Sequence, residues 1–178
     1  MFDASPVLWF TGLSGAGKTT IATEVRKRLL TAGVRTELLD GDEVRSTLSS
    51  DLGFSRAHRD LQVRRLGWVA GLLSRNQVLV LVSAISPYRE TRSSVLRSLP
   101  KGLEIFVSAP LAVLEDRDTK GLYKRARQGE IQNFTGVDDP YEAPDSPSLH
   151  LDTSTEALEE CVGKVLRMLS KECSIDVF

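Results

Sequence analysis

The chain has 178 residues, of which 41% are hydrophobic, and its 23 basic and 24 acidic side chains leave a net charge of −1. This size and composition predict one globular domain over residues 1–178. A charge near zero argues against nucleic acid or an anionic membrane as a partner, and every apolar run is too short to span a bilayer. The start lacks a basic, apolar leader, so we expect a cytoplasmic protein. Cys161 and Cys173 are too few for a disulfide framework and are expected to be packing thiols.

The first predicted elements are a buried strand at 7–11 and a helix at 18–30, joined by a glycine-rich segment. Residues 12–19 read Gly-Leu-Ser-Gly-Ala-Gly-Lys-Thr and fit the phosphate-binding pattern G-x-x-x-x-G-K-[ST]. The glycines let backbone N–H groups converge on phosphate oxygens, and the helix directs the positive end of its dipole to the same anion. We therefore expect Lys18 to reach the terminal phosphates of a nucleotide and Thr19 to offer its hydroxyl to Mg²⁺.

The second predicted strand, at 35–40, delivers two carboxylates at its end, Asp40 and Asp42. A phosphoryl transferase needs one carboxylate near its metal ion and one near the attacking hydroxyl. The third strand, at 77–83, ends without an acidic residue, so the magnesium role is assigned to Asp40. An Asp-Gly turn with solvated carboxylates is the alternative interpretation.

The remaining segments alternate between helices and strands. Further helices are predicted at 43–49, 55–74, 88–99, 110–117, 120–127 and 156–170, and further strands at 103–107 and 148–151. This alternation indicates an α/β fold with a central parallel five-stranded sheet flanked by helices, and a ligand site beyond the carboxyl ends of the strands. Trp9 and Trp68 are expected in the core. The long loop at 129–147 is of a kind that compact domains usually retain for function.

Basic residues cluster beyond the strand ends. Guanidinium groups there would bind the phosphate or sulfate of an acceptor through bidentate hydrogen bonds. The common alternative is that these arginines are solvated on helix surfaces. The cluster comprises Arg45, Arg56, Arg59, Arg64, Arg65, Arg89, Arg92, Lys120, Lys124, Arg125 and Arg127. Phe54 and Phe134 lie in predicted loops, where exposed rings can sandwich a purine or form a small satellite core. His58 and His150 do not assemble into a catalytic triad or a zinc site.

These motifs resemble the adenylylsulfate kinases, also called APS kinases. The resemblance covers nearly the whole chain in the order of the family. It rests on WFTGLSGAGKTT at 9–20, LDGDEVR at 39–45, LGFS at 52–55, the segment 59–65, ISPYR at 85–89, RDTKGLYKRAR at 117–127 and NFTGVDDPYEAP at 133–144. It implies a P-loop kinase fold with a mobile lid at about 118–147. The implied reaction transfers the γ-phosphate of ATP to the 3′-hydroxyl of adenosine 5′-phosphosulfate, giving 3′-phosphoadenosine 5′-phosphosulfate and ADP.

The resemblance also assigns roles to individual residues. ATP would be bound by Gly12, Ser14, Gly15, Ala16, Gly17, Lys18, Thr19, Thr20 and Arg117. The acceptor would be bound by Asp42, Arg45, Phe54, Arg59, Gln62, Ile85, Ser86, Lys120, Gly121, Leu122 and Phe134. Lys18, Asp40 and Asp42 would be catalytic, with Asp40 as the candidate base or magnesium-side carboxylate and Asp42 as an acceptor-side contact. Thr19 and Asp40 would bind Mg²⁺, partly through water. The resemblance implies a homodimer and a functional link to ATP sulfurylase.

Three departures from the family pattern stand out. Leu61-Gln62 replaces the usual Glu-Asn, Glu43 replaces a frequent asparagine, and only Met1 to Pro6 precede the first strand. The first departure bears on acceptor affinity, because Gln62 keeps the amide but lengthens its reach. Two alternatives stay open: a P-loop kinase for another small hydroxylated acceptor, such as a sugar or nucleotide, and a nucleotide-binding partner of a sulfate-activating enzyme without turnover.

Overall fold

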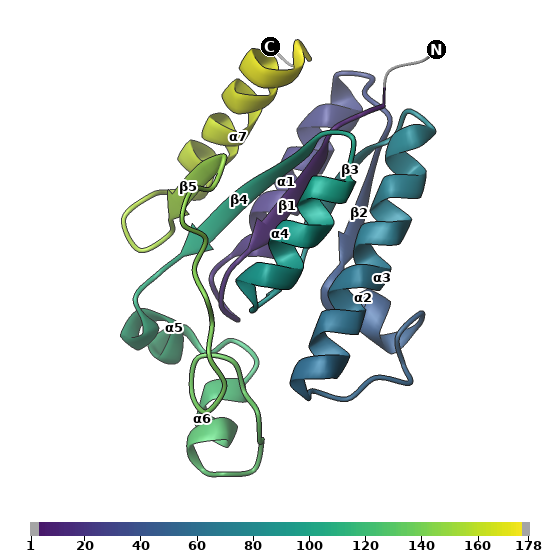
Figure 1. Ribbon diagram of the computed structural model, residues 1–178. Coiled ribbons are helices and arrows are strands. Elements are labelled where there is room, and N and C mark those ends of the chain that lie inside the picture. Colours follow the sequence, from purple (N-terminus) through teal and green to yellow (C-terminus); the bar gives the residue numbers. More distant parts are fainter. Residues whose placement is uncertain (1–3, 176–178) are drawn as a thin grey trace.

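The computed structural model describes residues 4–175, and part of the Met1 to Pro6 segment therefore lies outside the described residues. Five parallel strands form one sheet in the order β2-β3-β1-β4-β5, with helices on both faces (Figure 1). In chain order the elements are β1 Val7–Thr11, α1 Lys18–Thr31, β2 Thr36–Asp40, α2 Gly41–Ser46, α3 Arg56–Arg75, β3 Leu79–Ser83, α4 Arg89–Ser98, β4 Gly102–Ser108, α5 Leu111–Arg117, α6 Leu122–Arg127, β5 Leu149–Asp152 and α7 Leu158–Cys173. The predicted fold class is confirmed.

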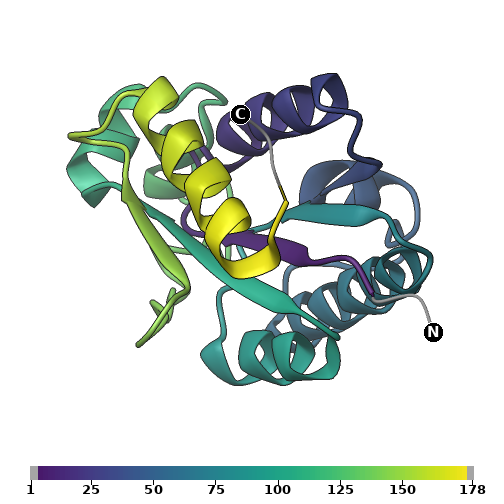
Figure 2. The ribbon, with the colours of Figure 1, turned by 90° about the horizontal axis from the view of Figure 1, so that it is seen from above.

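Two apolar cores lie on opposite faces of the sheet. Along β1, Leu8 and Phe10 face the core under α1 and α7, whereas Val7 and Trp9 face the core under α3 and α4. Figure 2 shows α1 in purple and α7 in yellow on one side of the sheet, opposite α3 and α4. Because both faces are covered, β1 and β3 are buried at every residue, which explains their continuous apolar sequences.

The prediction that Trp68 belongs to the core is wrong, since its side chain is 67% exposed. Helix α3 turns a different stripe toward the sheet, and the buried positions next to this tryptophan are Gly67 and Leu66. Leu61, on the same helix, is also exposed, at 40%. Trp9 is fully buried, as predicted.

The helix predicted at 43–49 begins two residues earlier, because Asp40 caps it. The Asp40 Oδ1 accepts hydrogen bonds from the backbone N–H of Asp42 at 2.9 Å and of Glu43 at 3.3 Å. A carboxylate in this position satisfies N–H groups that have no partner within the helix. The same residue that ends β2 therefore starts α2.

The long loop predicted at 129–147 is confirmed as a segment without a helix or a strand. Its internal order comes from turns and one isolated bridge, between Thr135 and Asp139. Within residues 4–175, every helix lacks the combination of length and apolar character that a membrane crossing requires.

Close packing of α3 on α4 leads to a first prediction. A Cβ atom added to Gly67 would lie 2.3 Å from Val95 Cγ1, and valine is stiff about its first side-chain torsion. Overpacking lowers the stability of the folded state by about 1–3 kcal/mol. The higher helix propensity of alanine relative to glycine offsets about 1 kcal/mol of this loss. We therefore expect Gly67→Ala to lower the free energy of unfolding in urea.

Val95→Ala supplies the control for this prediction. It should destabilise the protein alone through its cavity, but the double variant should be more stable than the sum of the single effects. Strictly additive effects would contradict the packing argument.

Candidate active site

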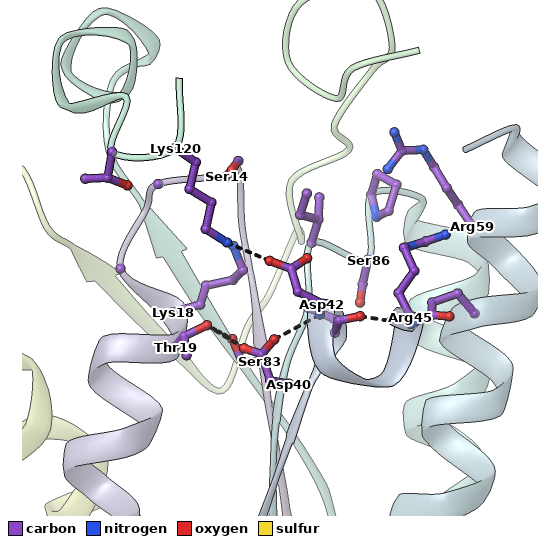
Figure 3. A pocket seen from close by; sticks show the side chains of 18 of the residues that line it. Ser14, Lys18, Thr19, Asp40, Asp42, Arg45, Arg59, Ser83, Ser86 and Lys120 are labelled. Carbon is purple, nitrogen blue, oxygen red and sulfur yellow. Dashed lines mark hydrogen bonds and ion pairs between the residues drawn. The ribbon is translucent and has the colours of Figure 1, made fainter. Parts of the chain in front are cut away.

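A cleft of about 530 Å³ lies at the carboxyl ends of the strands. It brings together residues from the glycine-rich loop, the β2–α2 junction, α3, the segment after β3 and the segment before α6 (Figure 3). Of the residues with predicted roles, the cleft is lined by Ser14, Gly15, Gly17, Lys18, Thr19, Thr20, Asp40, Asp42, Arg45, Phe54, Arg59, Gln62, Ile85, Ser86 and Lys120. The structure thus gathers most of the predicted site in one place.

The glycine-rich loop holds a buried lysine. Lys18 is 8% exposed, and its Nζ donates to the Leu13 carbonyl oxygen at 2.8 Å. Burial lowers the pKa of Lys18 to about 8, although Asp42 and Asp40 oppose this shift. At Gly12, with φ +149°, a Cβ would lie 2.0 Å from the Val107 carbonyl oxygen, so the loop passes β4 at a distance that only glycine permits.

Helix α1 begins inside this loop and leaves the N–H groups of its first turn available. Its N-cap residue, Gly17, has no side chain to cap the helix, and the first turn carries no acidic residue. These N–H groups and the positive end of the helix dipole favour an anion at this point of the cleft.

Thr19, Asp40 and Ser83 form a hydrogen-bonded triad at the base of the cleft (Figure 3). The Thr19 hydroxyl donates to Asp40 Oδ2 at 2.7 Å and lies 2.9 Å from the Ser83 Oγ. Because that hydroxyl has one proton, Ser83 must donate in the second contact. Ser83 was not predicted from the sequence. It ends β3, the strand whose end lacks the acidic residue expected for a magnesium site.

The triad offers ligands of the type that Mg²⁺ prefers. A hydroxyl and one carboxylate suit this ion, which usually combines few protein ligands with water and substrate phosphates. Residues 4–175 hold no cluster of three or more histidine, cysteine or acidic side chains able to bind a metal alone. The residues present therefore fit a metal ion that arrives with a nucleotide.

An ion pair crosses the cleft between Asp42 and Lys120. The Lys120 Nζ lies 2.6 Å from Asp42 Oδ2, and this contact raises the pKa of Lys120. Both side chains are well exposed, at 60% and 78% for the lysine and the aspartate. Exposed pairs contribute little free energy, so a ligand can replace this one.

The other end of the cleft carries two arginines around an exposed ring. The guanidinium carbon of Arg45 lies 4.7 Å and that of Arg59 5.5 Å from the centroid of the Phe54 ring, which is 54% exposed. Burial lowers the pKa of both arginines, and for Arg59 the carboxylate of Asp139 opposes the shift. Partly desolvated guanidinium groups beside an open aromatic face suit an anionic, aromatic ligand.

Arg59 is held in place mainly by carbonyl oxygens. It is 7% exposed and donates to the Phe54 oxygen at 3.0 Å and to the Asn133 oxygen at 2.5 Å. Asp139 lies 3.5 Å from its Nε. Sequence reasoning did not identify Asn133 or Asp139 as partners, since both lie more than 70 residues away in the chain.

Gln62 has a buried acceptor atom without a partner among the described residues. The side chain is 5% exposed and lines the cleft. Its Nε2 donates to the Gly41 oxygen at 3.2 Å, whereas its Oε1 has no hydrogen bond. An orphaned buried acceptor is costly, and a donor group on a bound ligand would satisfy it.

Six of the predicted residues do not line the cleft: Gly12, Ala16, Arg117, Gly121, Leu122 and Phe134. Phe134 takes the second of its two predicted alternatives, a small packed cluster rather than an exposed ring. It is 9% exposed and meets the Tyr123 ring edge-on, with centroids 5.1 Å apart, because α6 folds over it. Tyr123 also donates to the Ser14 carbonyl oxygen at 2.9 Å, a link to the glycine-rich loop that the sequence did not indicate.

Arg117 is connected to the glycine-rich loop through Thr153. It donates to the Thr153 carbonyl oxygen at 2.7 Å, and the Thr153 hydroxyl donates to the Ala16 oxygen at 3.0 Å. Gly121, in the left-handed region at φ +65°, caps α6, which Leu122 opens. Their roles in ligand binding stay predictions.

The lowered pKa of Lys18 predicts pH-dependent nucleotide binding. Bound phosphates favour the charged lysine, so binding takes up a proton above about pH 8. We expect the affinity for ADP, measured calorimetrically without metal, to fall as the pH rises through 8, by up to about tenfold per pH unit.

Lys18→Met is the control, because it should bind more weakly with little change between pH 7 and 9.5. Calorimetry in two buffers of different ionisation enthalpy would detect the proton uptake. A wild-type affinity that is flat across this range would contradict the assignment.

Comparisons with known proteins agree with this geometry. The adenylylsulphate kinase family model matches residues 4–152. An adenylyl-sulfate kinase of Picosynechococcus sp. is 56% identical over 164 residues, which are 92% of this chain and 93% of the relative. One of Deinococcus deserti is 56% identical over 160 residues, or 90% of this chain and 88% of the relative.

Solved structures give the same result. The Mycobacterium tuberculosis APS kinase CysC, in complex with AMPPNP and APS, superposes with a TM-score of 0.91 at 42% identity, covering 95% of this chain and 99% of that one. Shikimate kinase from Aquifex aeolicus, at a TM-score of 0.54 and 15% identity over 96% of this chain and 99% of that one, shares the fold alone. The chain therefore belongs to the adenylylsulphate kinase family.

Proposed function

We propose that this protein transfers the γ-phosphoryl group of ATP to the 3′-hydroxyl of adenosine 5′-phosphosulfate, giving 3′-phosphoadenosine 5′-phosphosulfate and ADP. One observation carries the proposal: a single cleft has a buried lysine in a phosphate loop at one end and two arginines around Phe54 at the other, with Asp42 between them (Figure 3). The relatives named adenylyl-sulfate kinase, and the similar structure solved with AMPPNP and APS, support it.

The nucleotide end would bind ATP through the glycine-rich loop. The free N–H groups at the start of α1 would receive phosphate oxygens, and Lys18 would neutralise charge on the transferred group. Its burial strengthens this attraction, because a desolvated ammonium interacts more strongly with an anion than a hydrated one does.

Thr19 and Asp40 would hold Mg²⁺, with Asp40 acting in part through water. The ion would supply charge neutralisation on the phosphates when bound. Asp40 suits this supporting role because both of its oxygens are already engaged, Oδ1 by two backbone N–H groups and Oδ2 by Thr19. It is fixed in one orientation.

Asp42 is the better candidate for contact with the acceptor hydroxyl. Its side chain is exposed in the cleft, and its ion pair with Lys120 is easily exchanged. In the proposed step, the 3′-oxygen forms a bond to the γ-phosphorus, the bond from that phosphorus to the β,γ-bridging oxygen breaks, and Asp42 takes the hydroxyl proton. Lys120, released from Asp42, would turn to the phosphates.

The acceptor end matches the chemistry of a sulfated nucleotide. Arg45 and Arg59 would bind the phosphosulfate group, the exposed ring of Phe54 would stack on adenine, and the orphaned Gln62 Oε1 would accept a hydrogen bond from a ligand donor. Phe134, buried against Tyr123, would support the second side of the adenine pocket after a local rearrangement.

A homodimer stays a prediction from the family resemblance, as does a functional link to ATP sulfurylase. The exposed side chains of Leu61, Trp68 and Leu72 lie along one side of α3 and offer an apolar surface for self-association. A similar APS kinase from Thiobacillus denitrificans is described as hexameric; it has a TM-score of 0.73 and 36% identity, covering 98% of this chain and 30% of that one.

Acceptor-dependent release of ADP tests the reaction. With ATP and adenosine 5′-phosphosulfate we expect turnover, and Lys18→Ala should reduce it by roughly 100-fold or more, as removal of a preorganised charge does. Lys27→Ala is the matched control, since this lysine lies on the same helix with a side chain that is 74% exposed.

Three results would contradict the proposal. Faster turnover with sugar or nucleotide acceptors would favour another small-molecule kinase. Tight binding of both ligands without product would favour a non-catalytic module. Unchanged turnover in Lys18→Ala would refute the role of this lysine.

Substitution of Phe54 tests the acceptor end separately. Phe54→Ala should raise the KM for adenosine 5′-phosphosulfate by about tenfold, since stacking on a base contributes roughly 1–3 kcal/mol, and should leave the KM for ATP unchanged. Leu48→Ala provides the comparison, because Leu48 is equally exposed at 55% but does not line this cleft. Equal loss of both affinities in Phe54→Ala would argue against a stacking role.

A further inference from the structure

Arg92 is a fully buried charged side chain that the proposed reaction does not use. It lies on α4, is 1% exposed, and all three of its nitrogen positions donate hydrogen bonds. Its Nε bonds to Glu104 Oε1 at 2.5 Å, its Nη1 to the Ser86 carbonyl oxygen at 2.5 Å and its Nη2 to the Glu142 carbonyl oxygen at 2.8 Å. Buried ion pairs are weak contributors to stability, so the targets of these bonds indicate the role of Arg92.

One target is the turn at Ile85 and Ser86, which forms part of the cleft wall (Figure 3). Ser86 has φ +47°, a left-handed conformation that is unfavourable for a residue other than glycine and needs support from its surroundings. That support comes from β1 and α4. The Trp9 Nε1 donates to Ser86 Oγ at 3.0 Å, Thr11 Oγ1 donates to the Ile85 oxygen at 2.7 Å, and Arg92 holds the Ser86 oxygen.

A second target is the segment at Tyr141 and Glu142, which lies within the long loop at 129–147. The Tyr141 hydroxyl lies 2.9 Å from Thr11 Oγ1, and its ring centroid is 5.8 Å from the Arg92 guanidinium carbon. The Glu142 N–H donates to the Pro87 oxygen at 2.9 Å. Arg92 therefore binds the strained turn and the segment packed against it with one rigid group.

We propose that Arg92 is a positioning residue for the acceptor end of the cleft. Its planar guanidinium fixes the left-handed turn at Ser86 against the segment 141–142 and so sets the position of the pocket wall formed by Ile85, Ser86 and Pro87. It acts through backbone carbonyl groups, unlike Arg45 and Arg59, whose side chains line the cleft.

The contacts of Arg92 also predict selectivity. They reach β4, the turn and the segment 141–142. Among the described residues, Arg92 forms no hydrogen bond with the glycine-rich loop at 12–19. Loss of Arg92 should therefore weaken productive binding of the acceptor and leave nucleotide binding unchanged. A lysine cannot replace it, because a single ammonium cannot present the fork that bonds both carbonyls and Glu104.

The experiment compares Arg92→Lys with wild type. This test rests on the proposed function, so wild-type turnover with adenosine 5′-phosphosulfate is measured first, and its absence would overturn the proposed function. In an active enzyme we expect Arg92→Lys to lower kcat/KM for the acceptor by about tenfold or more, as displacement of a substrate-positioning group does. The KM for ATP and the calorimetric Kd for AMPPNP should stay within twofold of wild type.

Two further variants keep the test decisive. Arg97→Lys, an exposed arginine of the same helix, should match wild type throughout. Tyr141→Phe keeps the guanidinium but removes the hydroxyl contact with Thr11, and it should raise the acceptor KM by about twofold to fivefold while sparing ATP.

Parallel losses of acceptor and ATP affinity in Arg92→Lys would overturn the proposal in favour of a purely structural role, and so would unchanged kinetics. If Arg92→Lys does not fold, Tyr141→Phe decides the question, and acceptor kinetics equal to wild type in that variant would overturn the proposal.

Discussion

The carboxylate of Asp40 connects the two halves of the cleft, and the arrangement of the remaining site depends on it. Its Oδ1 caps α2, the helix that carries Asp42 and Arg45, while its Oδ2 accepts a hydrogen bond from the Thr19 hydroxyl at the start of α1. One side chain therefore holds the start of α1, at the nucleotide end, in a fixed position relative to α2, at the acceptor end. A phosphoryl transfer that relies on positioning benefits from such a link, because movement of one substrate site relative to the other is restrained.

The fold and the nucleotide end of the site could be predicted because their signals are local. A strand buried on both faces is continuously apolar, as β1 and β3 are, and a phosphate loop needs its glycines and lysine within eight residues. The cap formed by Asp40 is also local, since it acts on the next three residues, although the sequence suggested only a turn there. Parallel strands bring their ends together, which placed Asp40 and Asp42 correctly.

The error at Trp68 and the open alternatives at Phe134 concern side chains whose surroundings come from distant segments. Trp68 is apolar and lies on a helix, yet whether it faces the sheet depends on how α3 rotates as Gly67 approaches Val95. Phe134 lies in a loop but is covered because Tyr123 folds over it from α6. Neither periodicity nor loop composition contains this information. The partners of Arg59 and Arg92 could not be predicted for the same reason, since most of their hydrogen bonds run to backbone carbonyls, which every residue has.

The net charge of −1 obscures how the cleft attracts anions. Four basic and three acidic side chains line it, so the local charge is nearly balanced. These charged groups nevertheless differ in their exposure to water. Lys18 and Arg59 are buried, whereas Asp42 and Lys120 are exposed. Salt and water weaken the exposed charges far more than the buried ones. The effective field inside the cleft is therefore more positive than a count of charges implies, and an anionic substrate gains most where Lys18 and Arg59 have already lost their hydration.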